Sequence, residues 1–208
     1  GLGHTRYGPM IYLKHDKFVG GSIAAYGDYS PAEVMFLRSL LQPGDCVMDI
    51  GANLGALTMP FAVQVGEKGS VFAFEPQPLV ARLLVANCAM NFFNQVQVIN
   101  AAVGEARSTL TLPIMNYNAD SNYGAADMKR LEELSATTDN VVTVDIVALD
   151  DLFSTDPTDL SKPYIRPKLM KIDVEGMELG VLKGGAKLIA ANKPILFVEC
   201  DRPNTAPE

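Results

Sequence analysis

Short apolar runs alternate with segments of helical periodicity along most of the chain. Runs with the length of a strand occur at residues 46–50, 70–74, 96–100, 169–173 and 195–199. Segments with apolar residues three and four positions apart, as in helices, occur at residues 57–65, 78–90 and 177–191, the last interrupted by Gly184 and Gly185. Continuously apolar strands joined by helices predict an α/β fold, in which a mostly parallel sheet is covered by helices on both faces.

Two parts of the chain depart from this alternation. Near the N-terminus, residues 10–13 and 17–19 predict a hairpin, and the next helix is expected to begin after Ser30, with Glu33 completing a capping box. Residues 105–167 contain two alternating segments separated by a stretch rich in Asn, Asp, Ser and Gly. We interpret them as an antiparallel insertion between the third and fourth core strands.

Composition narrows the classes of partner. The chain has 17 basic and 24 acidic residues and a formal net charge of -7, which disfavours a nucleic-acid partner. The longest apolar segments fall short of the roughly 18 residues that a membrane span needs. Cys46, Cys88 and Cys200 are widely spaced in apolar settings, which predicts reduced thiols and a cytoplasmic protein. His4 and His15 are too far apart in the sequence to suggest a histidine metal site.

A polar side chain stands at the end of every predicted core strand. These residues are Asp49, Glu75, Asn100, Asp173 and Glu199. The carboxyl ends of parallel strands meet at one edge of the sheet, where ligands bind. A single residue of this kind is explained equally well as a helix cap, but the five together predict a polar crevice.

The turn after the first core strand, Gly51-x-Asn53-x-Gly55, limits the ligand that this crevice can accept. Glycine at both ends lets the backbone approach a ligand closely. A dinucleotide fingerprint has glycine where Asn53 stands, so a pyrophosphate would meet a side chain. The Gly-Lys-Ser/Thr sequence of a phosphate-binding loop is also missing after this turn.

A nucleoside with a zwitterionic or cationic tail fits the charged residues better. Glu75, at the end of the second core strand, is placed to accept hydrogen bonds from two ribose hydroxyls. Asp49 and Asp173 would attract an ammonium or sulfonium centre. S-adenosylmethionine combines an adenosine, a sulfonium and an amino-acid tail.

Several motifs resemble the FkbM family of S-adenosylmethionine-dependent methyltransferases. They are Val-Met-Asp-Ile-Gly-Ala-Asn-Leu-Gly at 47–55, Phe-Glu-Pro at 74–76, Asn-Ala-Ala-Val-Gly at 100–104, Val-Ala-Leu-Asp-Asp at 147–151, Lys-Ile-Asp-Val-Glu-Gly at 171–176 and Leu-Lys-Gly-Gly-Ala at 182–186. The resemblance implies a doubly wound, Rossmann-like class I fold and methylation of a hydroxyl on a sugar, lipid or natural product. That class usually adds two strands after the fifth, and we expect these to be absent from this sequence.

The chain shows no repeat, low-complexity tract or linker, so we expect a single domain, 1–208, with four parts. They are an N-terminal extended segment and helix at 1–45, a cofactor-binding half at 46–104, an insertion at 105–167 and the last core strands at 168–208. The residues implied to bind S-adenosylmethionine are Asp49, Gly51, Ala52, Asn53 and Gly55 at the methionine end, Glu75 at the ribose, Pro76, Asn100, Ala101 and Ala102 at the adenine, and Asp173 at the amine or the methyl group.

Transfer to an alcohol needs alignment and removal of a proton. We assign the base, or the group that orients the acceptor, to Asp173 or Glu175. In the alternative, Asp173 binds only the cofactor and Glu175 pairs with Lys171.

Three further alternatives remain open. The first is a divalent metal held by Asp173, Glu175, Glu199 or Asp201, although no metal is assigned. The second and third are a nicotinamide-dependent oxidoreductase and a non-catalytic binding domain on the same fold. The expected partner is a small hydroxylated acceptor.

Overall fold

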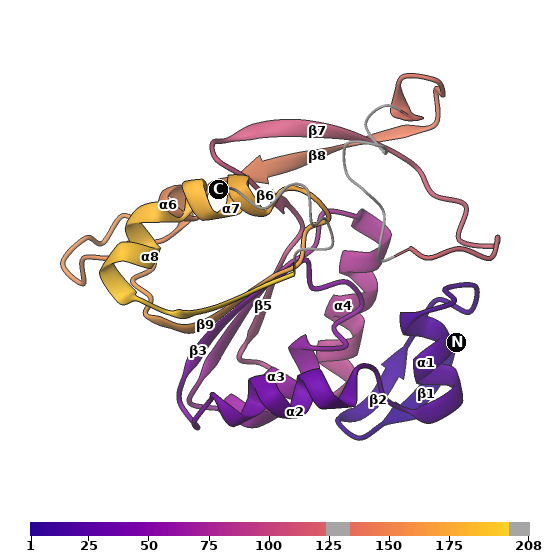
Figure 1. Ribbon diagram of the computed structural model, residues 1–208, viewed down its shortest axis with the longest axis horizontal. Helices are drawn as coiled ribbons and strands as arrows, with labels where there is room; N and C mark the ends of the chain where they lie inside the picture. Colours follow the sequence, from indigo (N-terminus) through magenta and orange to yellow (C-terminus); the bar gives the residue numbers. More distant parts are fainter. Residues whose placement is uncertain (124–133, 200–208) are drawn as a thin grey trace.

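The computed structural model describes residues 1–123 and 134–199 and contains the predicted parallel sheet (Figure 1). Its five strands lie in the order β10-β9-β3-β4-β5, and each neighbouring pair is parallel. The strands are β3 (Cys46–Ile50), β4 (Ser70–Phe74), β5 (Val96–Ile99), β9 (Pro167–Ile172) and β10 (Ile195–Val198). The α/β fold class is therefore confirmed.

Helices cover both faces of this sheet, as in a doubly wound fold (Figure 1). One face carries α2 (Pro31–Ser39), α3 (Thr58–Val65) and α4 (Pro78–Met90). The other carries α6 (Leu149–Leu152), α7 (Glu178–Gly184) and α8 (Ala186–Asn192). Alternate residues of each buried strand therefore enter two different cores. Within residues 1–123 and 134–199, no helix has the length and apolarity needed to cross a membrane.

The order of the strands places a topological switch point between β3 and β9. From β3 the chain continues outward through β4 and β5, and it later returns to the opposite side of β3 as β9. Ligands of open α/β sheets bind beyond the carboxyl ends of the strands at such a point. Asp49 of β3 and Asp173, just after β9, consequently come from neighbouring strands.

The insertion forms a second, three-stranded sheet in the order β6-β8-β7. The antiparallel pairing of β7 (Ser108–Pro113) with β8 (Val141–Val147) confirms the predicted pair. Strand β6 (Ala102–Val103) adds a parallel partner that was not predicted. Two residues are too few to show a period, so only long-range pairing reveals β6. Residues 124–133 of the polar loop lie outside the described part of the chain.

The predicted N-terminal hairpin is wrong in its position. The hairpin is formed by β1 (Leu2–Thr5) and β2 (Gly8–Ile11), while residues 17–19 lead into helix α1 (Val19–Tyr26). The carboxylate of Asp16 accepts hydrogen bonds from the N–H groups of Phe18 (3.2 Å) and Gly20 (3.0 Å). These bonds satisfy free N–H groups at the start of the helix and favour it over a strand.

The predicted capping box at α2 is also not formed. The helix begins at Pro31 as expected, but Ser30 has a left-handed backbone with φ 45° and makes no side-chain cap to the helix. Its hydroxyl donates instead to the Glu33 carboxylate at 2.7 Å. The contact therefore joins two side chains and leaves the first-turn N–H groups without that cap.

Candidate cofactor site

A cleft of about 280 Å³ lies beyond the carboxyl ends of β3, β4 and β9. That is close to the lower end of small-molecule sites, roughly 300 Å³. The predicted site residues that line it are Gly51, Ala52, Asn53, Glu75, Pro76, Ala101, Ala102, Asp173 and Glu175. Asp49, Gly55 and Asn100 do not belong to the lining residues. The structure thus brings most of the predicted residues to one cavity.

A glycine is required at position 51, where the turn after β3 meets the turn after β9. Its φ is 83°, and a Cβ added there would lie 1.7 Å from the carbonyl oxygen of Asp173. Its N–H and that of Ala52 both donate to the carbonyl of Phe74, at 3.0 and 2.9 Å. The glycine turn is therefore held against the ends of both neighbouring strands. This close contact between the turns depends on the absence of a side chain at position 51.

The other two positions of the turn motif, Asn53 and Gly55, have different roles. Asn53 has a left-handed backbone (φ 51°), and its side-chain oxygen accepts a hydrogen bond from the N–H of Leu54 at 2.7 Å. Such local bonding is the reason that Asn tolerates this conformation. A Cβ on Gly55 would lie 2.5 Å from Leu84 of α4, so Gly55 admits a packed helix and does not face the cleft.

Glu75 is a buried acid with acceptor capacity to spare. It is 5% exposed, and its two carboxylate oxygens accept one backbone N–H each, from Asn53 (3.0 Å) and Gln77 (2.8 Å). A carboxylate has about four acceptor sites, so each oxygen keeps one for a ligand. Burial raises the pKa of Glu75 to about 7, even though both hydrogen bonds lower it. Asn100 supports this corner by donating to the carbonyls of Glu75 and Pro76.

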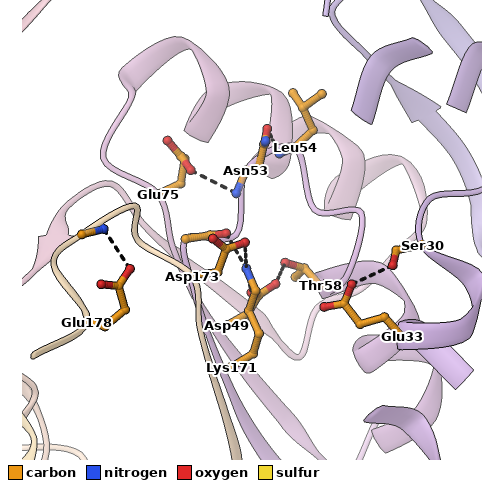
Figure 2. A network of polar contacts seen from close by, with 12 residues as sticks. Ser30, Glu33, Asp49, Asn53, Leu54, Thr58, Glu75, Lys171, Asp173 and Glu178 are labelled. Carbon is orange, nitrogen blue, oxygen red and sulfur yellow. Dashed lines mark hydrogen bonds and ion pairs between the residues drawn. The ribbon is translucent and has the colours of Figure 1, made fainter. Parts of the chain in front are cut away.

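Lys171 is a buried lysine that the site assignment from sequence missed. Figure 2 shows its ammonium between Asp173, at 3.1 Å, and Asp49, at 3.6 Å. It also donates to the carbonyl of Gly51 at 2.9 Å. Burial lowers the pKa of Lys171, but the charges of Asp49 and Asp173 outweigh that effect, and the pKa lies above its ordinary value. A lysine inside an apolar strand was the available signal, since a buried charge needs a counter-ion.

The mouth of the cleft joins N-terminal and C-terminal parts of the chain. Phe18, Val19 and Tyr29 line one side, and Glu175, Met177 and Glu199 line the other. Burial raises the pKa of the Tyr29 hydroxyl, and the charges of Glu33, Asp173 and Glu199 raise it further. The mouth is acidic because Asp173, Glu175 and Glu199 are among the lining residues. Phe18 and Val19 were not predicted because their segment was assigned to a hairpin.

The described residues contain no group of three or more His, Cys, Asp or Glu side chains suited to a metal ion. Asp201, one of the ligands considered for Mg²⁺, lies outside the described residues. The structure thus adds no support to the metal alternative.

The residues fit an adenosine ligand with a cationic tail. Glu75 offers two free acceptor positions for the paired hydroxyls of a ribose, and Pro76, Ala101 and Ala102 form an apolar wall beside it. Asp173, whose backbone adjoins Gly51, supplies negative charge to the cleft. This combination defines an α/β protein with a nucleoside-type binding cleft.

The family model described as Methyltransferase FkbM domain matches residues 49–207. The chain therefore belongs to the FkbM family of methyltransferases, and the resemblance drawn from its motifs is confirmed. The cofactor of this family is S-adenosylmethionine, as the motifs implied.

Relatives with known sequences or structures are similar over part of their length. "Methyltransferase 1" of Beauveria bassiana (strain ARSEF 2860) is 26% identical in an alignment 155 residues long, which covers 66% of this chain and 57% of that protein. The structure of methyltransferase FkbM from Methylobacillus flagellatus KT matches with 19% identity and a TM-score of 0.49, over 76% of this chain and 33% of that chain. A SAM-dependent methyltransferase from Aquifex aeolicus matches with 16% identity and a TM-score of 0.40, over 86% and 69% of the respective chains. This chain thus spans little more than half of its curated relative.

Proposed function

We propose that this protein transfers the methyl group of S-adenosylmethionine to a hydroxyl of a small-molecule acceptor. The observation that carries the proposal is the arrangement around Glu75. Its carboxylate lines the cleft, is fixed by two backbone N–H groups and keeps one acceptor position on each oxygen. Family membership supplies the reaction class, and Glu175 in the cleft lining offers a carboxylate suited to take the proton of a hydroxyl.

Each wall of the cleft has a task in this proposal. Glu75 binds the ribose, and the turn at Gly51 and Asn53 binds the methionine end together with Asp173. Bound S-adenosylmethionine supplies an electrophilic methyl group. Glu175, at the mouth beside Asp173, takes the proton of the acceptor hydroxyl or orients that hydroxyl. The protein contributes mainly by aligning the two reactants and excluding water.

The test is a transfer assay with methyl-labelled S-adenosylmethionine and a panel of sugars, lipid alcohols and hydroxylated natural products. We expect Glu175→Gln to lower kcat by about 10²-fold or more while the Kd for S-adenosylmethionine stays within about twofold. The matched control is Glu67→Gln, which changes an exposed glutamate away from the cleft and should leave both values unchanged. Unchanged turnover in Glu175→Gln would remove Glu175 from the mechanism. The panel also includes amines and carboxylic acids, and methylation confined to these would refute the hydroxyl assignment.

Two other functions make different predictions. A nicotinamide-dependent oxidoreductase would have to place a pyrophosphate at Asn53, whose side chain occupies the turn. A non-catalytic domain would bind S-adenosylmethionine but transfer its methyl group to no acceptor in the panel.

A further inference from the structure

We propose that Lys171 is a positioning residue of the cofactor site and that Asp49 acts on the cofactor only through Lys171. The inference rests on the function proposed above, because it concerns the same cleft. It assigns Asp49 a different role from the direct contact that the family resemblance implied.

Asp49 has no atom available to a ligand in the cleft. Its residue is fully buried and does not line the cavity. One carboxylate oxygen accepts a hydrogen bond from the Thr58 hydroxyl at 2.6 Å. The other has no hydrogen-bond partner, and it lies 3.6 Å from the ammonium of Lys171. A carboxylate this deeply buried needs a counter-ion, and Lys171 is that counter-ion.

Lys171 connects the two walls on which the cofactor would rest. It donates to the carbonyl of Gly51, in the turn after β3, and to Oδ2 of Asp173, just after β9. These walls are adjacent in space but 120 residues apart in the chain. Figure 2 shows the Lys171 ammonium in contact with the carboxylates of Asp173 and Asp49. Without that group, Asp173 would lose the contact that orients its side chain, and the carbonyl of Gly51 would lose its hydrogen-bond donor.

The charges of the three side chains leave one negative charge where a cation can reach it. Asp49 and Lys171 are buried and opposite in sign, whereas the Asp173 side chain is 27% exposed. Lys171 occupies Oδ2 of Asp173 and leaves Oδ1 for the ligand. The site therefore favours the positive centres of the S-adenosylmethionine tail, its ammonium and its sulfonium. The Glu75 carboxylate, the proposed ribose ligand, is held by the backbone N–H groups of Asn53 and Gln77. Its geometry should therefore not depend on Lys171.

The difference between two ligands isolates this role. S-adenosylmethionine carries an amino-acid end and a sulfonium charge, whereas 5′-methylthioadenosine has the same adenosine with a neutral thioether and neither positive centre. We expect Lys171→Met to weaken S-adenosylmethionine about tenfold or more, the size of one lost charge-assisted contact, and 5′-methylthioadenosine by less than about threefold. A general structural defect would weaken both ligands alike. The matched control is Lys168→Met, an exposed lysine on the same strand, which should leave both affinities unchanged.

A second variant protects the test against misfolding. Lys171→Met leaves Asp49 buried without a counter-ion, whereas Asp49→Asn combined with Lys171→Met removes both charges. If Asp49 acts only through Lys171, the double variant weakens S-adenosylmethionine as much as Lys171→Met does, within about threefold. Asp49→Asn alone should weaken it less, because the contacts of Lys171 with Asp173 and Gly51 remain.

Isothermal titration of each variant gives the affinities. The proposal is overturned if the double variant binds S-adenosylmethionine as tightly as the wild type, if it loses both ligands equally, or if Asp49→Asn alone has the largest effect. Failure of the proposed function has a different signature, since the wild-type protein would then bind S-adenosylmethionine without transferring its methyl group.

Discussion

Binding of an adenosine ligand should release a proton from Glu75. In the free protein, burial raises the pKa of this carboxyl to about 7, so near neutral pH a large fraction is protonated. Two ribose hydroxyls donating to its free acceptor positions would favour the carboxylate and return the pKa toward its ordinary value of 4.5. Ligand affinity should therefore rise with pH. With these two pKa values, linkage gives a gain of roughly 30-fold between pH 5.5 and pH 8.5.

The assay is isothermal titration with 5′-methylthioadenosine, which has the ribose hydroxyls but no amino acid that titrates in this range. Titrations at pH 7 in two buffers with different ionisation enthalpies should give about half a proton released per ligand bound. Glu75→Gln is the control, because its affinity, although weaker, should not change over the same pH range. An affinity that is flat within about twofold in the wild type, with no proton released, would refute the assignment of Glu75 to the ribose.

The same shift affects the stability of the free protein, and the sign follows from the two pKa values. The pKa of Glu75 is higher in the folded than in the unfolded state, so its stabilising contribution is complete below pH 4.5 and is lost as pH rises through about 7. A shift of this size corresponds to at most about 3 kcal/mol. Denaturant titrations of the ligand-free protein should show stability falling between pH 5 and pH 8 by more than in Glu75→Gln.

Two further substitutions test the packing that holds the site. Gly51→Ala should weaken S-adenosylmethionine by more than about tenfold in a calorimetric titration, because the added Cβ would clash with the Asp173 carbonyl. Gly66→Ala is its control, since Gly66 also has positive φ but nothing within 4 Å of an added Cβ. Asn87→Ala should lower the free energy of unfolding by about 3 kcal/mol in urea, because this buried side chain bonds both backbone polar groups of Ile11 and the carbonyl of Leu54. A change below about 1 kcal/mol would contradict that role.

The parts of the fold that depend on local pattern could be predicted from the sequence. The core strands are continuous apolar runs, and β4 at Ser70–Phe74 was placed without error. The break between α7 and α8 follows directly from Gly184 and Gly185. By contrast, the start of α1 depends on how the Asp16 carboxylate turns back toward Phe18 and Gly20, and residue types alone do not specify that.

In the candidate site, too, some features follow from local sequence and others depend on long-range contacts. Glu75 could be proposed because it ends a strand, and the acceptor positions left free by its two backbone contacts agree with that proposal. The direction of the Asp49 side chain could not be predicted from its position in the motif. It turns toward Thr58 and Lys171, and its pairing with Lys171 joins strands that are far apart in the sequence. Such charge pairs become visible only when the sheet is assembled.

Calorimetric titration of the protein with S-adenosylmethionine, and separately with NAD, tests the cofactor site most directly. We predict that S-adenosylmethionine saturates one site per chain and is displaced by 5′-methylthioadenosine, and that NAD gives no binding at the same concentrations. Saturable binding of NAD without binding of S-adenosylmethionine would contradict the assignment of the cleft around Gly51, Glu75 and Asp173.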